Sequence, residues 1–331
     1  MEKDIVKIKN LKTYFYTKEG IVKAVDDVSF NLKEGKTLGI VGESGCGKSA
    51  IAMSLMGILP EDIGKVSGGE ILFQDKNLVK LKEDDMRKIR GNDISLIFQE
   101  PMTALNPVYR VGDQIVESIM LHEKISKKEA NEKSVEMIKN VGIPRAEEIA
   151  KSYPHELSGG MRQRIVIAMA LSCNPKVLIA DEPTTALDVT VQAQILELMK
   201  NLKKKSNTSI ILITHDLGVV AEMCDYVVVM YAGKVVEEGD VLDIFENPMH
   251  PYTKGLLKSN PSTSNEEIWS GEIEELYTIK GQVPSPINLP SYCYFYDRCE
   301  KRSEKCKKGI PNIREIGEKH KVACYLYEKE L

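Results

Sequence analysis

The stretch that decides the fold is TLGIVGESGCGKSA, which runs from Thr37 to Ala50. Its part GESGCGKS, at Gly42–Ser49, fits the pattern G-x-x-x-x-G-K-[ST]. The apolar run Thr37–Val41 predicts a strand before this turn, and Ser49–Leu59 has helical character after it. In such a strand–turn–helix unit, the N–H groups of the turn and the positive end of the helix both attract phosphate. The stretch therefore predicts a site for the phosphates of a nucleotide.

Each residue type in this turn has a role in that chemistry. Glycines let the backbone curl around phosphate oxygens, Lys48 supplies a positive charge to the β- and γ-phosphates, and the Ser49 hydroxyl can ligate Mg²⁺. A chance glycine-rich turn is the alternative, but a random match in a chain of this length has a probability on the order of 1 in 100. The residues expected at the nucleotide are Gly42, Ser44, Gly45, Cys46, Gly47, Lys48, Ser49 and Ala50.

A second predicted strand ends in two acidic residues. In VLIADE, Val177–Glu182, an apolar run is followed by Asp181 and Glu182 at its carboxyl end, where open α/β sheets bind ligands. We expect Asp181 to hold Mg²⁺, directly or through water, and Glu182 to orient and deprotonate an attacking water. Alone, the pattern fits an ordinary strand with solvated acids equally well. Together with the phosphate loop, it favours the catalytic interpretation.

Apolar runs and helical stretches alternate through the middle of the chain. Ile94–Phe98 and Ser209–Thr214 predict strands, and helical patterns lie between them. This alternation indicates an α/β fold with a mostly parallel sheet covered on both faces. The alternation of Val6 and Ile8 with lysines predicts an antiparallel opening. Prolines become frequent after about Gly239, so we expect a domain boundary near residues 239–250.

Composition bounds the class of protein. The chain has 331 residues, more than the ~250–300 at which one core usually stops growing, so one large domain with an extension, or two domains, is expected. The formal net charge of −4 excludes a nucleic-acid binder that relies on overall charge. No apolar run reaches the ~20 residues of a membrane span, and the charged N-terminus does not resemble a signal peptide. We therefore expect the protein to stay in the cytoplasm, where structural disulfides are rare.

A third motif makes the class specific. LSGGMRQR, at Leu157–Arg164, resembles the signature LSGGQ of the nucleotide-binding subunits of ABC transporters, with Met161 at the fifth position. The serine and both glycines are intact, so contact with nucleotide should survive this departure. Ser158, Gly159 and Gly160 begin a predicted helix and offer hydroxyl and N–H donors to phosphate. The resemblance implies that they serve the nucleotide of the opposite subunit in a dimer.

Other elements of that family follow in order. By resemblance, Gln99 in FQEPMTALNP touches Mg²⁺ and couples the ATPase to the membrane subunits. Asp188, in the TALD segment, would cross the dimer interface, and His215, in LITHD, would contact the γ-phosphate. A lone glutamine would be a surface residue and a lone histidine a structural one, but the ordered set favours the functional roles.

An aromatic ring is also implied, because this family stacks adenine on one. Tyr14, Phe15 and Tyr16 lie upstream of the phosphate loop, where the family places that ring. The strand pattern favours Phe15, with Tyr16 next. Packing within the strand is the alternative role for the other two.

The resemblance covers residues 1 to about 240. It implies an α/β ATPase core with an N-terminal antiparallel β subdomain and an inserted helical subdomain at about 100–158. We assign 1–240 to this ATPase domain and 241–331 to a C-terminal extension. Two segments, PMTALNP after Gln99 and NPMHPYTKGLL at 247–257, resemble the ATPase subunits of dipeptide, oligopeptide and nickel importers. A proline-rich linker is the alternative interpretation of the second.

The resemblance implies an ATPase subunit that binds ATP and Mg²⁺ and drives import of dipeptides or oligopeptides. The implied partners are two integral membrane permeases, a second ATPase subunit and an extracytoplasmic binding protein, which would make this chain peripheral at the cytoplasmic face of the membrane. An importer of nickel or another small solute is the main alternative. A DNA-repair or chromosome-structure ATPase would need a long coiled coil, and an ABC translation factor usually has two cassettes; the sequence has neither feature.

Four cysteines cluster near the end of the chain, at Cys293, Cys299, Cys306 and Cys324. In a cytoplasmic chain they favour a metal over disulfides, and four thiolates suit Zn²⁺ or an iron–sulfur cluster. Their spacing fits neither zinc knuckles nor bacterial ferredoxin runs. The region 281–331 resembles the cysteine region of peptide-importer ATPases, some of which carry a [4Fe–4S] cluster. We therefore expect that cluster, with zinc or free thiols as alternatives.

The other candidate ligands have plainer interpretations. His320 is a candidate fifth ligand, but a solvated surface histidine is the expected state. Cys173 and Cys224 have the character of small core residues, and Cys46 fills a variable position of the phosphate loop.

Overall fold

The structure is a computed structural model that describes residues 3–99, 104–185, 187–259 and 277–328. The chain forms two compact units. The first comprises Met1–Ile5, Leu32–Thr37 and Lys80–Ile213, and the second comprises Val6–Asn31, Leu38–Val79 and Thr214–Leu331. Parts of two predicted motifs, residues 100–103 and Ala186, lie outside the described residues, as do residues 260–276 of the extension.

The first unit contains three parallel strands, β6 (Ile94–Ile97), β7 (Val177–Asp181) and β8 (Ser209–Ile213). β7 pairs with β6 on one side and with β8 on the other. Every residue of β7 and β8 is buried, as expected for parallel strands covered on both faces. The strands predicted for these three apolar runs are confirmed.

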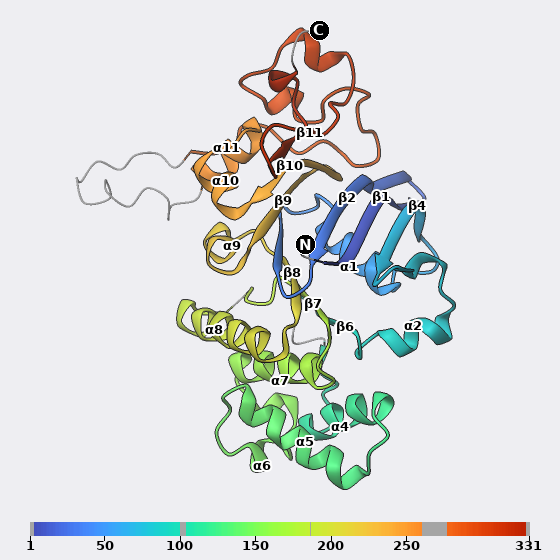
Figure 1. Ribbon diagram of the computed structural model, residues 1–331, viewed down its shortest axis with the longest axis vertical. Helices are drawn as coiled ribbons and strands as arrows, with labels where there is room; N and C mark the ends of the chain where they lie inside the picture. Colours follow the sequence, from blue (N-terminus) through green and yellow to red (C-terminus); the bar gives the residue numbers. More distant parts are fainter. Residues whose placement is uncertain (1–2, 100–103, 186, 260–276, 329–331) are drawn as a thin grey trace, which may run out of the picture. The chain divides into compact units, whose positions relative to one another are not determined.

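This unit also contains a group of helices. Figure 1 shows α4 to α7 gathered together, and α7 packs against both α4 and α5. α5 starts at a capping box, in which Ser126 and Glu129 each bond the other's backbone N–H. The helical patterns predicted for this part of the chain are therefore confirmed. The helices are α2 (Glu83–Ile89), α4 (Val111–His122), α5 (Lys127–Asn140), α6 (Ala146–Ile149), α7 (Gly159–Leu171) and α8 (Val189–Ser206).

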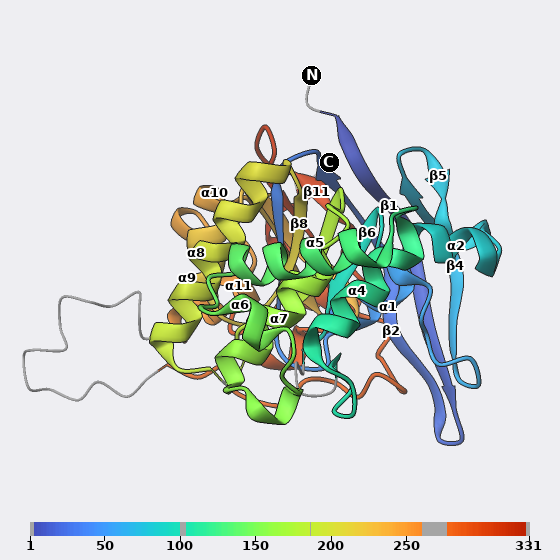
Figure 2. The ribbon, with the colours of Figure 1, turned by 90° about the horizontal axis from the view of Figure 1, so that it is seen from below.

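The second unit contains the antiparallel sheet that the opening of the sequence predicts. Its strands lie in the order β2-β1-β4-β5, and Figures 1 and 2 both show β1, β2 and β4 side by side. Val6 and Ile8 of β1 are buried while the lysines beside them are less so, which is the predicted alternation. The strands are β1 (Asp4–Thr17), β2 (Gly20–Lys33), β4 (Gly64–Phe73) and β5 (Lys76–Asn77).

A second group of strands in this unit carries the phosphate loop. β3 is parallel to β9, β9 is antiparallel to β10, and β12 joins β10 to β11. These strands are β3 (Thr37–Val41), β9 (Tyr226–Tyr231), β10 (Lys234–Asp240), β11 (Arg314–Glu315) and β12 (Lys321–Val322). The helices of this unit are α1 (Lys48–Met56), α9 (Leu217–Met223), α10 (Val241–Glu246) and α11 (Pro251–Lys258).

The pairing of β12 with β10 corrects one expectation. We expected His320 to be a solvated surface residue, and this is wrong because it is only 8% exposed. Its Nε2 lies 2.7 Å from Oε1 of Glu237, which is itself buried in β10. β12 begins directly after His320, so the strand pairing carries the imidazole against β10. The proline-rich extension thus adds a strand beside β10, the last strand before residue 241.

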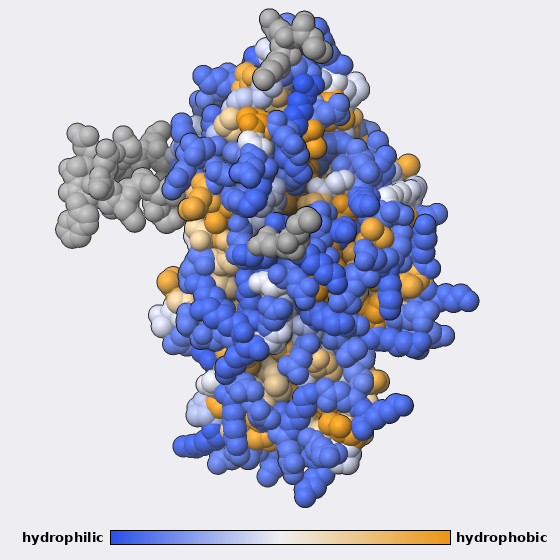
Figure 3. Space-filling model, in the orientation of Figure 1, coloured by the Kyte–Doolittle hydropathy of each residue, from blue (hydrophilic) through white to orange (hydrophobic). Residues whose placement is uncertain are grey.

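The molecular surface is mostly polar on the face drawn in Figure 3, where apolar residues form separate small patches. Among the helices of the described residues, none is both long enough and apolar enough to cross a bilayer. Cys173 and Cys224 are buried, as expected for small core residues.

Candidate functional site

The phosphate loop follows β3, and its glycines adopt a backbone conformation that other residues rarely take. The dihedral angle φ is +151° at Gly42, +79° at Gly45 and +105° at Gly47. A Cβ atom on Gly47 would lie 2.0 Å from the carbonyl oxygen of Ala24, and one on Gly42 would lie 2.3 Å from that of Met230. Neighbouring backbone therefore excludes any side chain at these two positions.

Lys48 starts α1, and its ammonium group lies against the loop. Its Nζ donates to the carbonyl oxygens of Gly42 at 2.7 Å and Glu43 at 3.1 Å, and the residue is 5% exposed. Ser49 is half-buried beside it in the first turn of the helix. The loop thus holds one positive charge and one hydroxyl at the place where its glycines turn.

The other predicted loop residues divide by exposure. Ser44 and Gly45 are exposed, whereas Cys46 and Ala50 are buried. Burial also raises the pKa of the Cys46 thiol. Cys46 and Ala50 can therefore reach a nucleotide only through their backbone, while the Ser44 hydroxyl is accessible.

The three aromatic residues near the end of β1 have different surroundings. The Tyr14 hydroxyl donates to Oδ1 of Asp26 at 2.7 Å, and burial together with this bond raises the pKa of Tyr14. Phe15 is half-buried beside Gly64, and Tyr16 is 45% exposed. Phe15 and Tyr16 keep accessible ring surface, and the choice of Phe15 over Tyr16 stays a prediction.

At the end of β7, two donors hold the carboxylate of Glu182. Its Oε2 accepts from Nε2 of Gln99 at 3.0 Å and from Oγ1 of Thr185 at 2.9 Å. The backbone at Glu182 has φ +47°, a strained value of the kind that clusters at active sites. Asp181 is the buried last residue of β7. The structure therefore brings together Gln99 and Glu182, which the sequence predicted from separate motifs.

Two helix starts meet at the predicted signature. Ser158 caps α7, because its Oγ accepts a backbone N–H of that helix. Asp188 caps α8 in the same way, through Val191. A Cβ atom on Gly160 would lie 2.9 Å from Cγ1 of Val191, so a glycine lets the two helix starts pack closely. Gly159 is exposed, with open space where a Cβ would be.

His215 follows β8 in the chain and is exposed. Its neighbour Asp216 caps α9 by accepting the backbone N–H groups of Gly218 and Val219. His215 therefore lies two residues before α9, and its contact with a γ-phosphate stays a prediction.

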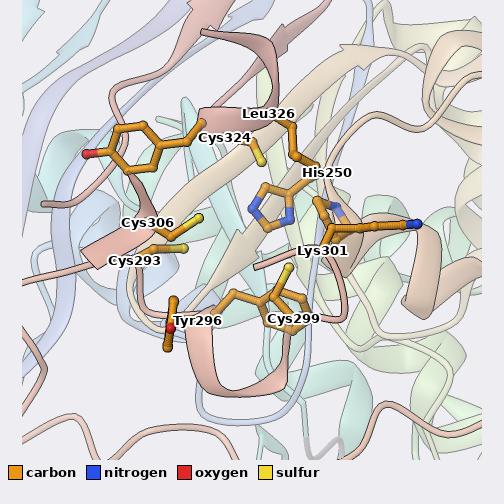
Figure 4. A pocket seen from close by; sticks show the side chains of 11 residues that line it. His250, Cys293, Tyr296, Cys299, Lys301, Cys306, Cys324 and Leu326 are labelled. Atoms are coloured by element: carbon orange, nitrogen blue, oxygen red, sulfur yellow. The ribbon is translucent and has the colours of Figure 1, made fainter. Parts of the chain in front are cut away.

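The four extension cysteines line a single cavity. Figure 4 shows the sulfur atoms of Cys293, Cys299, Cys306 and Cys324 around a common centre, with the ring of His250 beside them. All seven cysteines of the chain are free thiols. Burial raises the pKa of Cys293 to about 12 and that of Cys324 to about 11. Within the described part of the chain, however, no three His, Cys, Asp or Glu side chains stand close enough to hold a metal ion. The metal centre therefore stays a proposal.

Sequence reasoning missed four residues that contact the predicted site. Thr185 belongs to the predicted TALD segment, but its bond to Glu182 depends on the turn after β7. Glu43 lies inside the phosphate loop and is bound by Tyr252 and Arg298 of the extension. The segment 247–257, which contains Tyr252, is the signal in the sequence for this contact.

Comparison with protein families gives two matches that together span most of the chain. Residues 25–185 match the family described as ABC transporter. Residues 236–306 match the family described as oligopeptide/dipeptide transporter, C-terminal region.

Curated proteins match over nearly the whole length. The oligopeptide transport ATP-binding protein AppD of Bacillus subtilis is 54% identical over 326 residues, which cover 98% of each chain. The dipeptide transport ATP-binding protein DppD of the same organism is 52% identical over 329 residues, 99% of this chain and 96% of that one. The oligopeptide transport ATP-binding protein OppD of Escherichia coli is 49% identical over 327 residues, 99% of this chain and 94% of that one.

Solved structures of related proteins share the fold. The ATP-binding cassette MJ0796, in a dimeric post-hydrolysis state bound to ADP and Pi, aligns with a TM-score of 0.64 at 28% identity, covering 71% of this chain and 98% of that one. The protein cbiO1 of Clostridium perfringens, part of the ABC transporter complex cbiONQ, aligns with a TM-score of 0.63 at 30% identity, covering 74% and 92%. This likeness confirms the predicted α/β fold with its antiparallel sheet and helices.

Proposed function

This chain belongs to the ATP-binding proteins of oligopeptide and dipeptide ABC transporters, and from that membership we infer that it is the ATPase subunit of a peptide importer. It hydrolyses ATP to ADP and phosphate, and this reaction drives the uptake of dipeptides or oligopeptides. The observation that carries the chemistry is the Glu182 carboxylate, oriented by Gln99 and Thr185 at the end of a buried strand. A carboxylate fixed in this way can act as the general base for water.

The nucleotide roles follow from the chemistry of the residues. Lys48 would neutralise the β- and γ-phosphates, and the Ser49 hydroxyl would hold Mg²⁺. Asp181 and Gln99 are the other residues that we assign to this ion. Glu182 takes the proton of the attacking water. The placement of Lys48 against the loop carbonyls and the two donors to Glu182 support these assignments.

The remaining nucleotide contacts are assigned from the resemblance to ABC ATPases. His215 contacts the γ-phosphate, and Phe15 stacks on adenine, with Tyr16 as the alternative. In a dimer of ATPase subunits, Ser158, Gly159 and Gly160 bind the nucleotide of the opposite subunit, and Asp188 crosses the interface. The exposure of Ser158, Gly159 and Asp188 supports this arrangement, because a partner can reach them.

Exposed apolar side chains support a membrane partner. They lie in the segment that follows β6 and includes α4, close in sequence to Gln99. Leu121 of this segment is 74% exposed. By the family resemblance, we assign this segment to the docking area for two permease subunits at the cytoplasmic face of the membrane. The exposed residues are Phe98, Val108, Tyr109, Met120 and Leu121.

The test of the transport function uses the complex. The tagged chain should co-purify from membranes with two permeases and a second ATPase subunit. In vesicles that contain the complex and the extracytoplasmic binding protein, ATP should drive the uptake of short peptides, and Lys48→Ala should abolish it. Uptake of Ni²⁺ without peptide uptake would instead establish the alternative solute.

The chemistry of the four cysteines supports a metal–sulfur centre, because four thiolates suit an iron–sulfur cluster or zinc. All four thiols line one cavity, and the cysteine segment of about forty residues is too small to bury a sufficient core of its own. We assign a [4Fe–4S] cluster to Cys293, Cys299, Cys306 and Cys324, with zinc as the alternative. Such a centre supplies folding energy to the segment that binds it.

Metal analysis decides this assignment. Protein purified without oxygen should contain four iron and four sulfide per chain, as that cluster requires, and absorb broadly near ~400 nm. One zinc and no iron would overturn the cluster but keep the four-cysteine site. If neither metal is present and all four thiols are alkylated in the folded protein, both assignments are wrong.

A further inference from the structure

Two side chains of the C-terminal extension form hydrogen bonds with Glu43. This residue belongs to the phosphate loop, but we assign it no role in the nucleotide chemistry. The Tyr252 hydroxyl accepts the backbone N–H of Glu43 at 2.8 Å. The Arg298 guanidinium donates two bonds to the Glu43 carboxylate, from Nη1 to Oε2 at 2.6 Å and from Nη2 to Oε1 at 2.9 Å. The loop is therefore held at its main chain and its side chain by residues more than 200 positions further along the chain.

Hydrogen bonds and aromatic rings hold the Arg298 side chain in place. Its side chain is 5% exposed and donates as well to the backbone oxygens of Lys280 and Ile279. The guanidinium lies 5.7 Å from the ring centre of Tyr231 and 5.9 Å from that of Phe295. A two-bond fork in a shielded place is among the stronger ion pairs, and loss of one partner leaves the other charge uncompensated.

Tyr252 belongs to the same packed group. It is fully buried, and its ring centre lies 4.8 Å from that of Tyr231 and 5.5 Å from that of Phe295. Phe295 also lines the cysteine cavity, and Arg298 directly precedes Cys299. The contacts with the phosphate loop are thus made by the folded body that surrounds the cysteines, and not by a loose tail.

We propose that Arg298 and Tyr252 are positioning residues for the phosphate loop, so that the folded extension sets the affinity of this ATPase for ATP. The carbonyl oxygens of Gly42 and Glu43 accept from the Lys48 ammonium group, so a fixed Glu43 also fixes that charge. A loop arranged before binding loses less conformational freedom when ATP arrives. Because neither residue touches the reacting atoms, binding changes and the chemical step does not.

The proposal rests on the nucleotide role assigned to the phosphate loop, and its test separates affinity from turnover. In the full-length chain, Arg298→Gln should raise the Kd for ATP by about tenfold, since it removes a charge-assisted pair. Tyr252→Phe removes one neutral acceptor and should raise the Kd by about threefold. In both variants kcat at saturating ATP should stay within about twofold of the wild type, because the carboxylate base is untouched.

Two further variants sharpen the comparison. Lys321→Gln breaks a different ion pair of the extension, with Glu238 at 2.8 Å, and should leave the Kd unchanged. Adding Glu43→Gln to Arg298→Gln removes the stranded carboxylate charge, so the double variant should bind ATP more tightly than Arg298→Gln alone. Recovery of this kind indicates a direct pair and not a general loosening of the extension.

An unchanged Kd in both single variants overturns the proposal, and so does a lower kcat at unchanged Kd. If Arg298→Gln does not fold, Tyr252→Phe decides the question, because it deletes only a hydroxyl oxygen. Lys48→Ala separates the nucleotide role of the phosphate loop from the positioning role of Arg298 and Tyr252. If Lys48→Ala binds and hydrolyses ATP normally, the nucleotide role of the loop is wrong. If it is inactive while Arg298→Gln and Tyr252→Phe bind ATP as the wild type does, only the positioning role is wrong.

Discussion

The substitution Glu182→Gln tests the chemistry most directly. It preserves the size of the side chain, and the amide oxygen can still accept from Gln99 and Thr185. Each of these bonds loses its charged acceptor, which costs about 1 kcal/mol per bond at most and less where the site is partly exposed. The variant should therefore fold, with a melting temperature lowered by only a few degrees.

The rate should fall far more than the stability. An amide cannot take a proton from water, and removal of a general base typically costs about 10²–10⁴ in rate. That loss corresponds to about 3–5 kcal/mol of activation free energy, which exceeds the loss of folding free energy of about 2 kcal/mol at most. ATP binding should persist, so the variant should trap a closed, ATP-bound dimer.

The assay measures phosphate release under single-turnover conditions and ATP binding separately. The matched control is Thr185→Val, which removes one donor to Glu182 but keeps the carboxylate, and should cost less than about tenfold in rate. Turnover of Glu182→Gln within tenfold of the wild type would refute the assignment. So would an equal loss in Thr185→Val, because the carboxylate would then not be the group that matters.

Three other outcomes test separate parts of the structure. A mixture of Lys48→Ala subunits and Gly160→Asp subunits should have ATPase activity that neither variant has alone, because one of the two sites in the mixed dimer is then intact. A mixture as inactive as its components would contradict a site shared between subunits. Replacing any one of the four extension cysteines with serine should remove the iron and the absorbance near ~400 nm, whereas Cys173→Ser should keep both. Metal analysis and an absorbance spectrum of each variant test this prediction. Gly47→Ala should lower the free energy of unfolding by more than about 2 kcal/mol, because its Cβ would lie 2.0 Å from a backbone oxygen. Gly45→Ala, which has open space around the new Cβ, should lower it by about 1 kcal/mol. Equal shifts in melting temperature for the two variants would argue against the close contact.

The sequence by itself determined the parts of the fold whose causes are local. Thr37–Val41 and Val177–Asp181 are strands, and each consists mainly of a short apolar run of the kind that parallel sheets bury between layers. The glycines of the phosphate loop were recognisable because a backbone that turns with positive φ needs them at fixed spacing. Gln99 and Glu182 were chosen from separate motifs, and the structure joins them by a hydrogen bond.

Only the tertiary structure decided which distant residues meet. His320 looked like a surface histidine because the sequence does not reveal that β12 pairs with β10 and brings it to the buried Glu237. Glu43 and Arg298 are 255 positions apart, and neither lies in a pattern that names the other. Local periodicity fixes which face of an element is apolar, but a buried ion pair depends on how whole segments pack, since only packing removes both charges from water together.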